Sequence, residues 1–475
     1  MIKFEIVVNS LRRNEITDGF LSITKILAHL ATAFDTVHYE LSWHGILIRR
    51  SFIQILMTFP QLFEIMITFY LNDFWLMRFF VILLSYGTIS IPIILVVFYV
   101  RRRAAEDGFQ PTTLFYSFLR SFALGKPEYG LMISDSVKLT SIVSQKNLRD
   151  DSLHLILCFS CLQFTLILMG YIQERIITQA YLSIVDDQLN KFENTQFLVF
   201  INRVFAVILC AVYLISNWKR EPPHVPPFYK HSFTSFSNTL SSWCQYEALK
   251  FVSFPTQTVC KASKVLPTML MGFIVRGERY KCGECACTIM LAFGATLFVL
   301  SNSSKEHTSN AVLSSDHVNT ISGICLMSGY LLFDAFTLNW QKKLFDARPR
   351  VSRYQMMFGV NVFSMILCSV TLIQEGTFLS SFHFLITHKG FARDIFLLSL
   401  SGALGQIVIY TTIERFGPVI FAVMMTLRQI LSILLSVVAY DHPMSVWSIF
   451  SLLITFIAIF GTIYARRHHT LQSKH

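Results

Sequence analysis

The sequence predicts an all-α polytopic membrane protein with about ten to twelve spanning helices and no soluble catalytic domain, and three observations support this fold class. Hydrophobic residues make up 53% of the 475 positions, charged residues only 15%, and the mean hydropathy is +0.51; a soluble domain carries about 25% charged residues. Apolar stretches of about 20 residues recur, long enough to cross a hydrocarbon core of about 30 Å as helices. The stretches are continuous and do not alternate, which argues against transmembrane strands.

The first 74 residues predict an N-terminal extension. Residues 1–50 are polar with little pattern, and an apolar stretch follows at residues 51–70. This stretch is either a signal anchor or a span, and Pro60 and Glu64 weaken the second interpretation. Both alternatives stay open.

The first secure span is predicted at residues 75–100. It ends at the basic run Arg101–Arg103, and a polar connection of about 50 residues extends to residue 151. One extra helix and a connection therefore precede the main array of spans.

Ten further apolar segments predict the main array of spanning helices. They cover residues 153–173, 197–217, 232–252, 256–275, 283–301, 319–340, 354–374, 394–413, 417–439 and 445–464. The polar linker 302–318 divides them into a first half at 152–301 and a second at 319–464, with a tail at 465–475. Five helices followed by five is the arrangement expected when two halves insert with inverted topology.

The distribution of basic residues predicts the orientation. With Arg101–Arg103 placed in the cytosol, the basic connections 342–353 and 466–474 fall on the same side, and few Lys or Arg fall on the other. Because cytoplasmic loops of membrane proteins are enriched in Lys and Arg, the C-terminus is expected in the cytosol and the linker in the lumen. The sequon at Asn302 would then be luminal, close to a span end.

Four basic residues inside the predicted spans stand out as candidates: Arg203, Lys261, Lys264 and Arg428. A cation at mid-membrane is costly, so it usually faces a cavity or a partner. Gln257, Lys261 and Lys264 are spaced i, i+4, i+7, which predicts one shared helical face.

The acids in the spans are too few to neutralise these cations. Glu247 and Asp334 are the visible candidates. Internal salt bridges and snorkelling are the structural alternative, which applies most readily to Lys261. Glu247 could also pair with Lys250, three residues further along. The excess of positive charge favours an anionic ligand.

Other site chemistries find little support. The ten Cys are scattered, and the closest group, Cys282, Cys285 and Cys287, has neither a second ligand pair nor a nearby His, so no metal is expected. Lys and Arg form no aromatic-interleaved basic surface, which argues against nucleic acid. The sequence also lacks HExxH, GxSxG and Walker-type motifs, so we expect no enzyme and no cofactor.

Several long segments resemble the nucleotide-sugar transporter family. They are SSWCQYEALKFVSFPTQTVCKASKVLPTMLMG (241–272), SGYLLFDAFTLNWQKKLF (328–345), QMMFGVNVFS (355–364), VMMTLRQILSILLS (423–436), GYIQERIITQAY (170–181) and QFLVFINRVFAV (196–207). The resemblance covers about residues 75–464. The chain departs from the family pattern at Cys260, where Ala is usual, and in the first 74 residues.

The resemblance implies ten helices in two inverted five-helix halves around a central cavity, and exchange of a luminal nucleotide for a cytosolic activated donor. It implies the multi-pass Golgi membrane as the location, with the lipid bilayer as the surroundings; a homodimer is left open. Carried over residue by residue, the substrate-binding candidates are Arg203, Tyr246, Glu247, Gln257, Lys261, Lys264, Asn339, Gln341, Gln355, Asn361 and Arg428.

The charge of these candidates predicts the substrate class. 3'-Phosphoadenosine 5'-phosphosulfate (PAPS) carries about four negative charges near pH 7, which four intramembrane cations match better than the roughly two charges of a nucleotide diphosphate sugar. The resemblance, supported by this match of charge, implies an antiporter that imports PAPS into the Golgi lumen for sulfation and returns adenosine 3',5'-bisphosphate. A transporter of another anionic nucleotide donor, such as a UDP-sugar, is the alternative, and a polytopic lipid-modifying enzyme is a remote one.

Overall fold

The computed structural model describes residues 75–107, 114–125, 148–184, 188–192, 194–222, 224–248, 251–252, 257, 260–261, 263–303, 317–347, 351–374, 376–439, 449–451 and 453–462. The apolar stretch 51–70, most of the linker 302–318 and the tail 465–475 lie outside these residues. The described chain forms two compact units. The first unit comprises 75–98, 171–204 and 365–399, and the second comprises the described residues within 99–170, 205–364 and 400–462.

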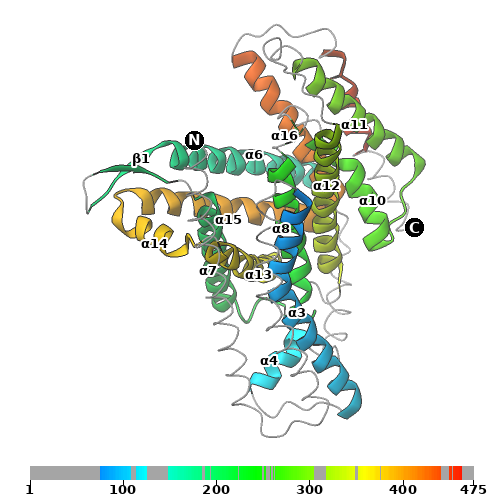
Figure 1. Ribbon diagram of the computed structural model, residues 1–475. Coiled ribbons are helices and arrows are strands. Elements are labelled where there is room, and N and C mark those ends of the chain that lie inside the picture. The colour runs from blue at the N-terminus through cyan, green and yellow to red at the C-terminus, as the bar shows by residue number, and fades with distance from the viewer. Residues whose placement is uncertain are drawn as a thin grey trace. The chain divides into compact units, whose positions relative to one another are not determined.

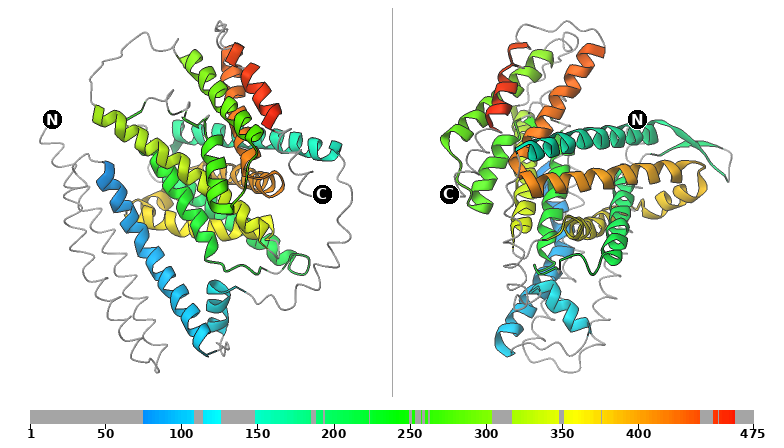
Figure 2. Two further views of the ribbon diagram at one scale, coloured as in Figure 1. Left: turned by 90° about the vertical axis from the view of Figure 1, so that its right-hand side faces the viewer. Right: turned by 180° about the vertical axis from the view of Figure 1, so that it is seen from behind.

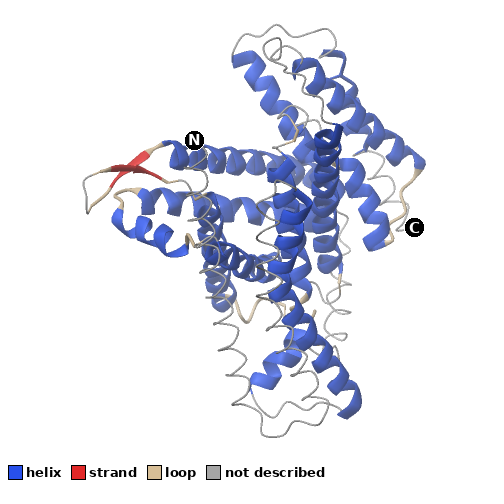
Figure 3. Ribbon diagram, in the orientation of Figure 1, coloured by secondary structure: helices blue, strands red, loops and turns tan. Residues whose placement is uncertain are grey.

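Helices dominate the described residues (Figure 1). They are α3 (Trp75–Asp107), α4 (Leu114–Ala123), α6 (Leu148–Thr178), α7 (Thr195–Ser216), α8 (Lys230–Ala248), α10 (Val265–Arg276), α11 (Cys282–Ser303), α12 (His317–Asp346), α13 (Arg353–Gln374), α14 (Phe378–Thr387), α15 (Phe391–Phe416) and α16 (Pro418–Ala439). The two short strands are β1 (Ala180–Leu182) and β2 (Leu189–Lys191), red in Figure 3. Most helices coincide with predicted spans, whereas α4, α14 and the hairpin lie in segments predicted as connections.

The chain is a polytopic membrane protein. Four of the described helices are long and apolar enough to cross a membrane: Leu153–Thr178, Thr195–Ser216, Arg353–Ile373 and Phe391–Phe416. Shorter apolar helices accompany them, among them Val265–Arg276 and Pro418–Leu431. Large side chains such as Phe164 stay exposed on α6, as expected for helices whose outer surface faces lipid. The arrangement of ten helices in inverted halves stays a prediction.

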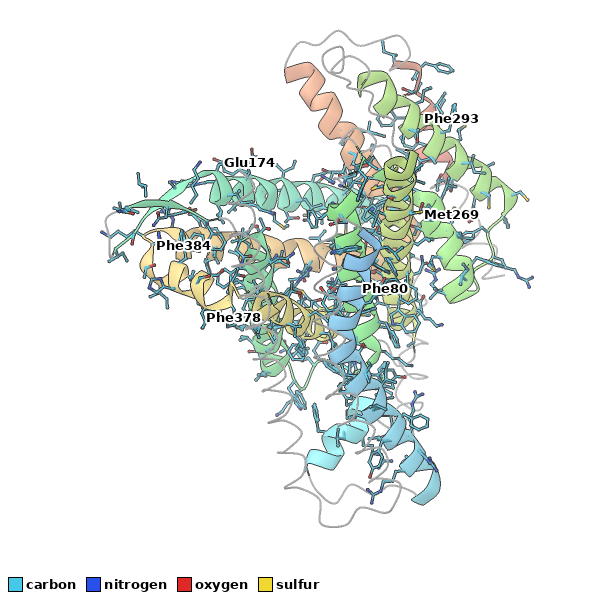
Figure 4. The ribbon with its side chains drawn as sticks, in the orientation of Figure 1. Phe80, Glu174, Met269, Phe293, Phe378 and Phe384 are labelled. Atoms are coloured by element: carbon cyan, nitrogen blue, oxygen red, sulfur yellow. The ribbon has the colours of Figure 1, made fainter. Side chains whose placement is uncertain are left out.

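An aromatic core fixes the first unit around the hairpin. β1 and β2 pair antiparallel, with Tyr181 opposite Asn190. The ring of Phe192, just after β2, packs 4.7 Å from Phe391 and 5.1 Å from Phe384, measured between centroids. Phe384 belongs to α14, and Figure 4 labels it near the end of that helix. The hairpin thus anchors α14 to the start of α15.

A buried carboxylate closes the same region. Asp394 lies in the first turn of α15, where the helix dipole favours a negative charge. Tyr181 donates its hydroxyl to Asp394 at 3.1 Å, and the guanidinium groups of Arg393 and Arg175 lie 3.2 and 3.8 Å from the carboxylate. Both guanidinium groups are substantially exposed, whereas the Asp394 side chain is 4% exposed. The buried Asp394 carboxylate is therefore contacted by one hydroxyl group and two guanidinium groups.

In the second unit, serine hydroxyls on α8 hold α12. Ser237 donates to the carbonyl of Phe333 at 2.7 Å, and Ser241 donates to the carbonyl of Tyr330 at 3.1 Å. The two helices run side by side in both views of Figure 2. Small polar side chains allow such close approach and add interhelical hydrogen bonds inside a membrane. This is why α8, although low in hydropathy, is packed inside the unit.

α10 packs between α12 and α16. Asn339 of α12 donates to the carbonyl of Thr268 on α10 at 2.9 Å. A Cβ at Gly272 would lie only 3.1 Å from the Asn339 side chain and would displace the Tyr280 hydroxyl, so glycine favours this close approach. Met269 of α10 is buried, whereas Phe293 of the neighbouring α11 is exposed; both are labelled in Figure 4.

A tight joint connects α15 to α16. Gly417 has φ +87°, a left-handed conformation that glycine adopts without strain. Its amide bonds to the carbonyl of Ile413 at 3.1 Å and so closes α15, and Pro418 then begins α16, a position where its missing N–H is not needed. This joint fixes the start of the helix that carries Phe421 and Arg428.

Candidate functional site

The candidate site begins where the helix of the predicted span 256–275 is interrupted. Residues 263 and 264 form a turn, and α10 starts only at Val265. Pro267 explains the interruption, because it has no N–H to donate to the carbonyl of Ser263; the amide of Leu266 takes that carbonyl instead at 3.2 Å. That Gln257, Lys261 and Lys264 share one helical face stays a prediction; the described residues show that α10 itself begins only after Lys264.

Lys264 occupies this turn and is 8% exposed. Its Nζ lies 3.6 Å from a carboxylate oxygen of Asp334 on α12. It also lies 5.6 Å from the ring centroid of Phe421 on α16, close enough for a cation–π attraction. The sequence named Asp334 as a candidate acid without assigning it to a cation, and the structure pairs it with Lys264.

Lys261 faces a polar partner. Its Nζ donates to Oε1 of Gln257 at 3.1 Å, and Nε2 of Gln257 donates to the carbonyl of Gln245 on α8 at 3.0 Å. The charge of Lys261 is also within range to interact unfavourably with those of Lys264 and Arg428. Gln257 thus links a cation to α8 without neutralising it.

Arg428 supplies the third cation, from α16. Its Nε is buried without a hydrogen-bond partner among the described residues. The phenol of Tyr330, one turn before Asp334 on α12, lies within electrostatic range of both Arg428 and Asp334. Tyr330 is 8% exposed. An unpartnered guanidinium N–H is a donor that an anion could satisfy.

We call Lys261, Lys264 and Arg428 the cation cluster; Asp334 and Tyr330 accompany it. α10, α12 and α16 pack together around it, and Val265 forms a common apolar core with Val419 and Ala422. A guanidinium binds phosphate or sulfate oxygens with a two-pronged geometry, whereas an ammonium acts as a point charge. The arrangement can therefore hold an anion.

Other predicted site residues lie elsewhere. Arg203 is half-buried on α7 in the first unit, within electrostatic range of Cys368 on α13. On α8, the Tyr246 side chain is 61% exposed, whereas Glu247 is buried. Their participation stays a prediction.

The polar residues predicted from the second half mainly connect backbone segments. Asn339 holds α10, as described above. Gln355 donates to the carbonyl of Pro222 at 2.6 Å and accepts from the amide of Ser352. Asn361 donates to Gln406 on α15 at 2.8 Å. The buried Oε1 of Gln341 has no hydrogen-bond partner among the described residues.

Three neighbours of the cation cluster were not predicted as site residues. Asp334 had a signal in the sequence, because an acid inside an apolar span is rarely accidental. Tyr330 and Phe421 had none, since aromatic residues are frequent throughout the spans. Within the described residues, no group of three or more His, Cys, Asp or Glu is placed to hold a metal ion.

Comparison with known proteins identifies the family. A sequence model of the UAA transporter family matches residues 154–466. The chain is 52% identical over 402 residues to adenosine 3'-phospho 5'-phosphosulfate transporter 1 of Caenorhabditis elegans, covering 82% of this chain and 92% of the relative. It is 37% identical over 398 residues to the Homo sapiens protein of the same name, covering 83% and 88%.

A relative that is named for a different substrate is less similar to this chain. The chain is 34% identical over 304 residues to UDP-galactose/UDP-glucose transporter 5B of Arabidopsis thaliana, covering 64% of this chain and 84% of the relative. These matches confirm the resemblance to nucleotide-sugar transporters. The chain belongs to the UAA transporter family and is a membrane transporter, not an enzyme.

Proposed function

We propose that this protein imports PAPS from the cytosol into the Golgi lumen in exchange for adenosine 3',5'-bisphosphate. Two relatives named as PAPS transporters, at 52% and 37% identity over more than four fifths of the chain, support this substrate. Golgi location, exchange and a cytosolic C-terminus are parts of the proposal that rest on the sequence.

The cation cluster is the observation that carries the proposal. Among the described residues, Asp334 is the carboxylate shown in contact with one of the three cations, which leaves these four side chains a net charge of about +2 in a region enclosed by apolar helices. Such an excess is expensive inside a membrane unless a ligand offsets it. PAPS brings about four negative charges, carried by phosphate and sulfate groups. A net charge of about +2 calls for an anionic ligand but does not by itself separate PAPS from a UDP-sugar with about two negative charges, so the choice of PAPS rests on the two relatives.

The role proposed for each cation follows from the chemistry of its side chain. Arg428 would take two oxygens of a phosphate or sulfate group through its planar fork. Lys264 would contribute a point charge from the turn before α10, and Lys261 a second one from beside Gln257. Movement of a fixed site between the two faces would then exchange one bound anion for the other.

Uptake into proteoliposomes containing the purified protein tests the proposal. We expect saturable entry of radiolabelled PAPS, accelerated when the vesicles are preloaded with adenosine 3',5'-bisphosphate. Equal entry into loaded and empty vesicles would indicate a uniporter. Entry of UDP-galactose in place of PAPS would favour the alternative substrate class. The orientation is checked by adding protease to sealed Golgi vesicles that contain the protein with an epitope placed after His475. Cleavage of the epitope is expected for a cytosolic C-terminus. Protection of the epitope would mean that the C-terminus is luminal.

A further inference from the structure

We propose that Asp334 is an internal competitor for the substrate: its carboxylate neutralises Lys264 between transport events and speeds the release of the bound anion. Asp334 is thus a positioning residue that touches the cation and not the substrate. This inference rests on the proposed function, and it assigns a role to a residue outside the predicted site.

The contact between Asp334 and Lys264 is close but loose. The separation of 3.6 Å exceeds the 2.7–2.9 Å of a charge-assisted hydrogen bond. The Asp334 side chain is 23% exposed and the Lys264 side chain 10%. An ion pair of this kind is attractive without being locked in one geometry, so an incoming anion can replace it.

Asp334 and Lys264 differ in how freely their side chains can move. α12 is held on either side of Asp334: the carbonyls of Tyr330 and Phe333 accept serine hydroxyls from α8, and Asn339 donates to α10. Asp334 also has a short side chain. Lys264 instead extends a flexible four-carbon stem from a turn. The lysine is therefore the partner that can turn from the carboxylate to a substrate.

The charges around Lys264 explain how the Asp334 carboxylate affects substrate binding. Lys261 and Arg428 favour an anion at this place, while Asp334 is the acid shown in contact with Lys264. A phosphate that approaches Lys264 must compete with this carboxylate and is repelled by it. Removing the charge should therefore tighten substrate binding, and tighter binding slows release, which limits the turnover of an exchanger.

Asp334→Asn and Asp334→Glu test this inference with opposite expectations. Equilibrium binding of radiolabelled adenosine 3',5'-bisphosphate gives the Kd, and exchange in proteoliposomes gives the maximal rate. Asp334→Asn should lower the Kd by roughly three- to thirtyfold, the range spanned by partly exposed to buried ion pairs, and should lower the maximal rate. Asp334→Glu extends the carboxylate toward Lys264 and should raise the Kd.

Asp346→Asn is the matched control. Asp346 lies at the end of the same helix and pairs with Lys342 at 3.0 Å, but its side chain is 54% exposed. The same chemical change there should leave the Kd and the rate within about twofold of wild type.

The outcomes separate this inference from the proposed function. If wild-type protein shows no saturable binding of the bisphosphate, the proposed function fails. If wild type binds but Asp334→Asn binds equally or more weakly, Asp334 is a structural partner and the inference alone fails. If Asp334→Asn does not fold, the Asp334→Glu variant decides: binding as tight as wild type would contradict competition.

Discussion

The first and second units both bury ionised side chains, but with opposite balances of charge. In the first unit the buried ion is the Asp394 carboxylate, and Tyr181, Arg393 and Arg175 surround it. Its basic partners reach water. In the second unit the enclosed ions are mainly cations, and Asp334 contacts one of them.

This difference separates a structural network from the proposed binding site. A buried acid with a hydrogen bond and two partly solvated guanidinium groups is stable as it stands, and it links α15 to the hairpin. In the cation cluster, by contrast, the described contacts pair only Lys264 with an acid, so the arrangement makes physical sense with an anionic ligand. The three substitutions below separate the two roles.

The largest effect is expected at Lys264. Lys264→Ala should reach its membrane normally yet lose most PAPS transport. Loss of a charge-assisted contact costs roughly 1.5–3 kcal/mol, about tenfold to a hundredfold in apparent affinity. Lys264→Arg should keep part of the activity, because the charge stays while the geometry changes. Uptake assays with matched amounts of correctly localised protein measure both variants.

The outcome also decides how the cation cluster is interpreted. Wild-type affinity and rate in a correctly localised Lys264→Ala protein would contradict substrate contact. Retention of a misfolded variant would instead point to the pair with Asp334 as a structural element. The double variant Lys264→Ala with Asp334→Asn removes both charges and should restore folding in that case, but not transport.

Asp394→Asn should lower the stability of the protein and leave ligand binding unchanged, which is the opposite of the result expected for Lys264→Ala. Asparagine can still accept a hydrogen bond from the Tyr181 hydroxyl, but it loses the electrostatic attraction to Arg175 and Arg393. We expect a loss of roughly 1–3 kcal/mol in stability, seen as a lower Tm in detergent, with the Kd for adenosine 3',5'-bisphosphate unchanged. A weakened Kd with an unchanged Tm would show that the first unit also acts in binding. Asp334→Asn is the matched change in the other region.

Long apolar helices and embedded charges could be predicted from the sequence, since both depend on local composition. Segments such as 153–173 and 354–374 can cross the membrane as helices by length alone. Arg428 and Lys264 are conspicuous in apolar surroundings, and the structure brings both within electrostatic range of Lys261.

The turn at Lys264 and its acidic partner could not be predicted with the same ease. Pro267 is visible in the sequence, but proline is tolerated in the first turn of a helix, so its presence alone does not place the start of α10 at Val265. Asp334 lies 70 residues from Lys264 in the chain. Their contact depends on the packing of α10 against α12, in which Asn339 donates to the carbonyl of Thr268, and a one-dimensional pattern does not reveal this packing.

The smallest expected effect concerns Tyr181, whose phenol caps the Asp394 network. Burial, and then the neighbouring Asp394 carboxylate, raise the pKa of Tyr181 from 10.0 to about 12. Because the folded-state pKa lies above the unfolded value, the neutral phenol stabilises the fold fully below about pH 10, and this contribution is lost as the pH rises toward 12. Tyr181→Phe should cost about 1 kcal/mol at neutral pH.

Thermal unfolding of both proteins across the pH range measures this effect. Tyr181→Phe should lower the Tm by a few degrees at pH 7, and the gap to wild type should shrink between pH 10 and 12, because only wild type has this phenol to ionise. The difference in tyrosinate absorbance between the two proteins should follow the same pH range. Transport and the Kd should not change, since the phenol lies in the first unit. A gap that stays constant up to pH 12 would show that the hydroxyl does not stabilise the fold through Asp394.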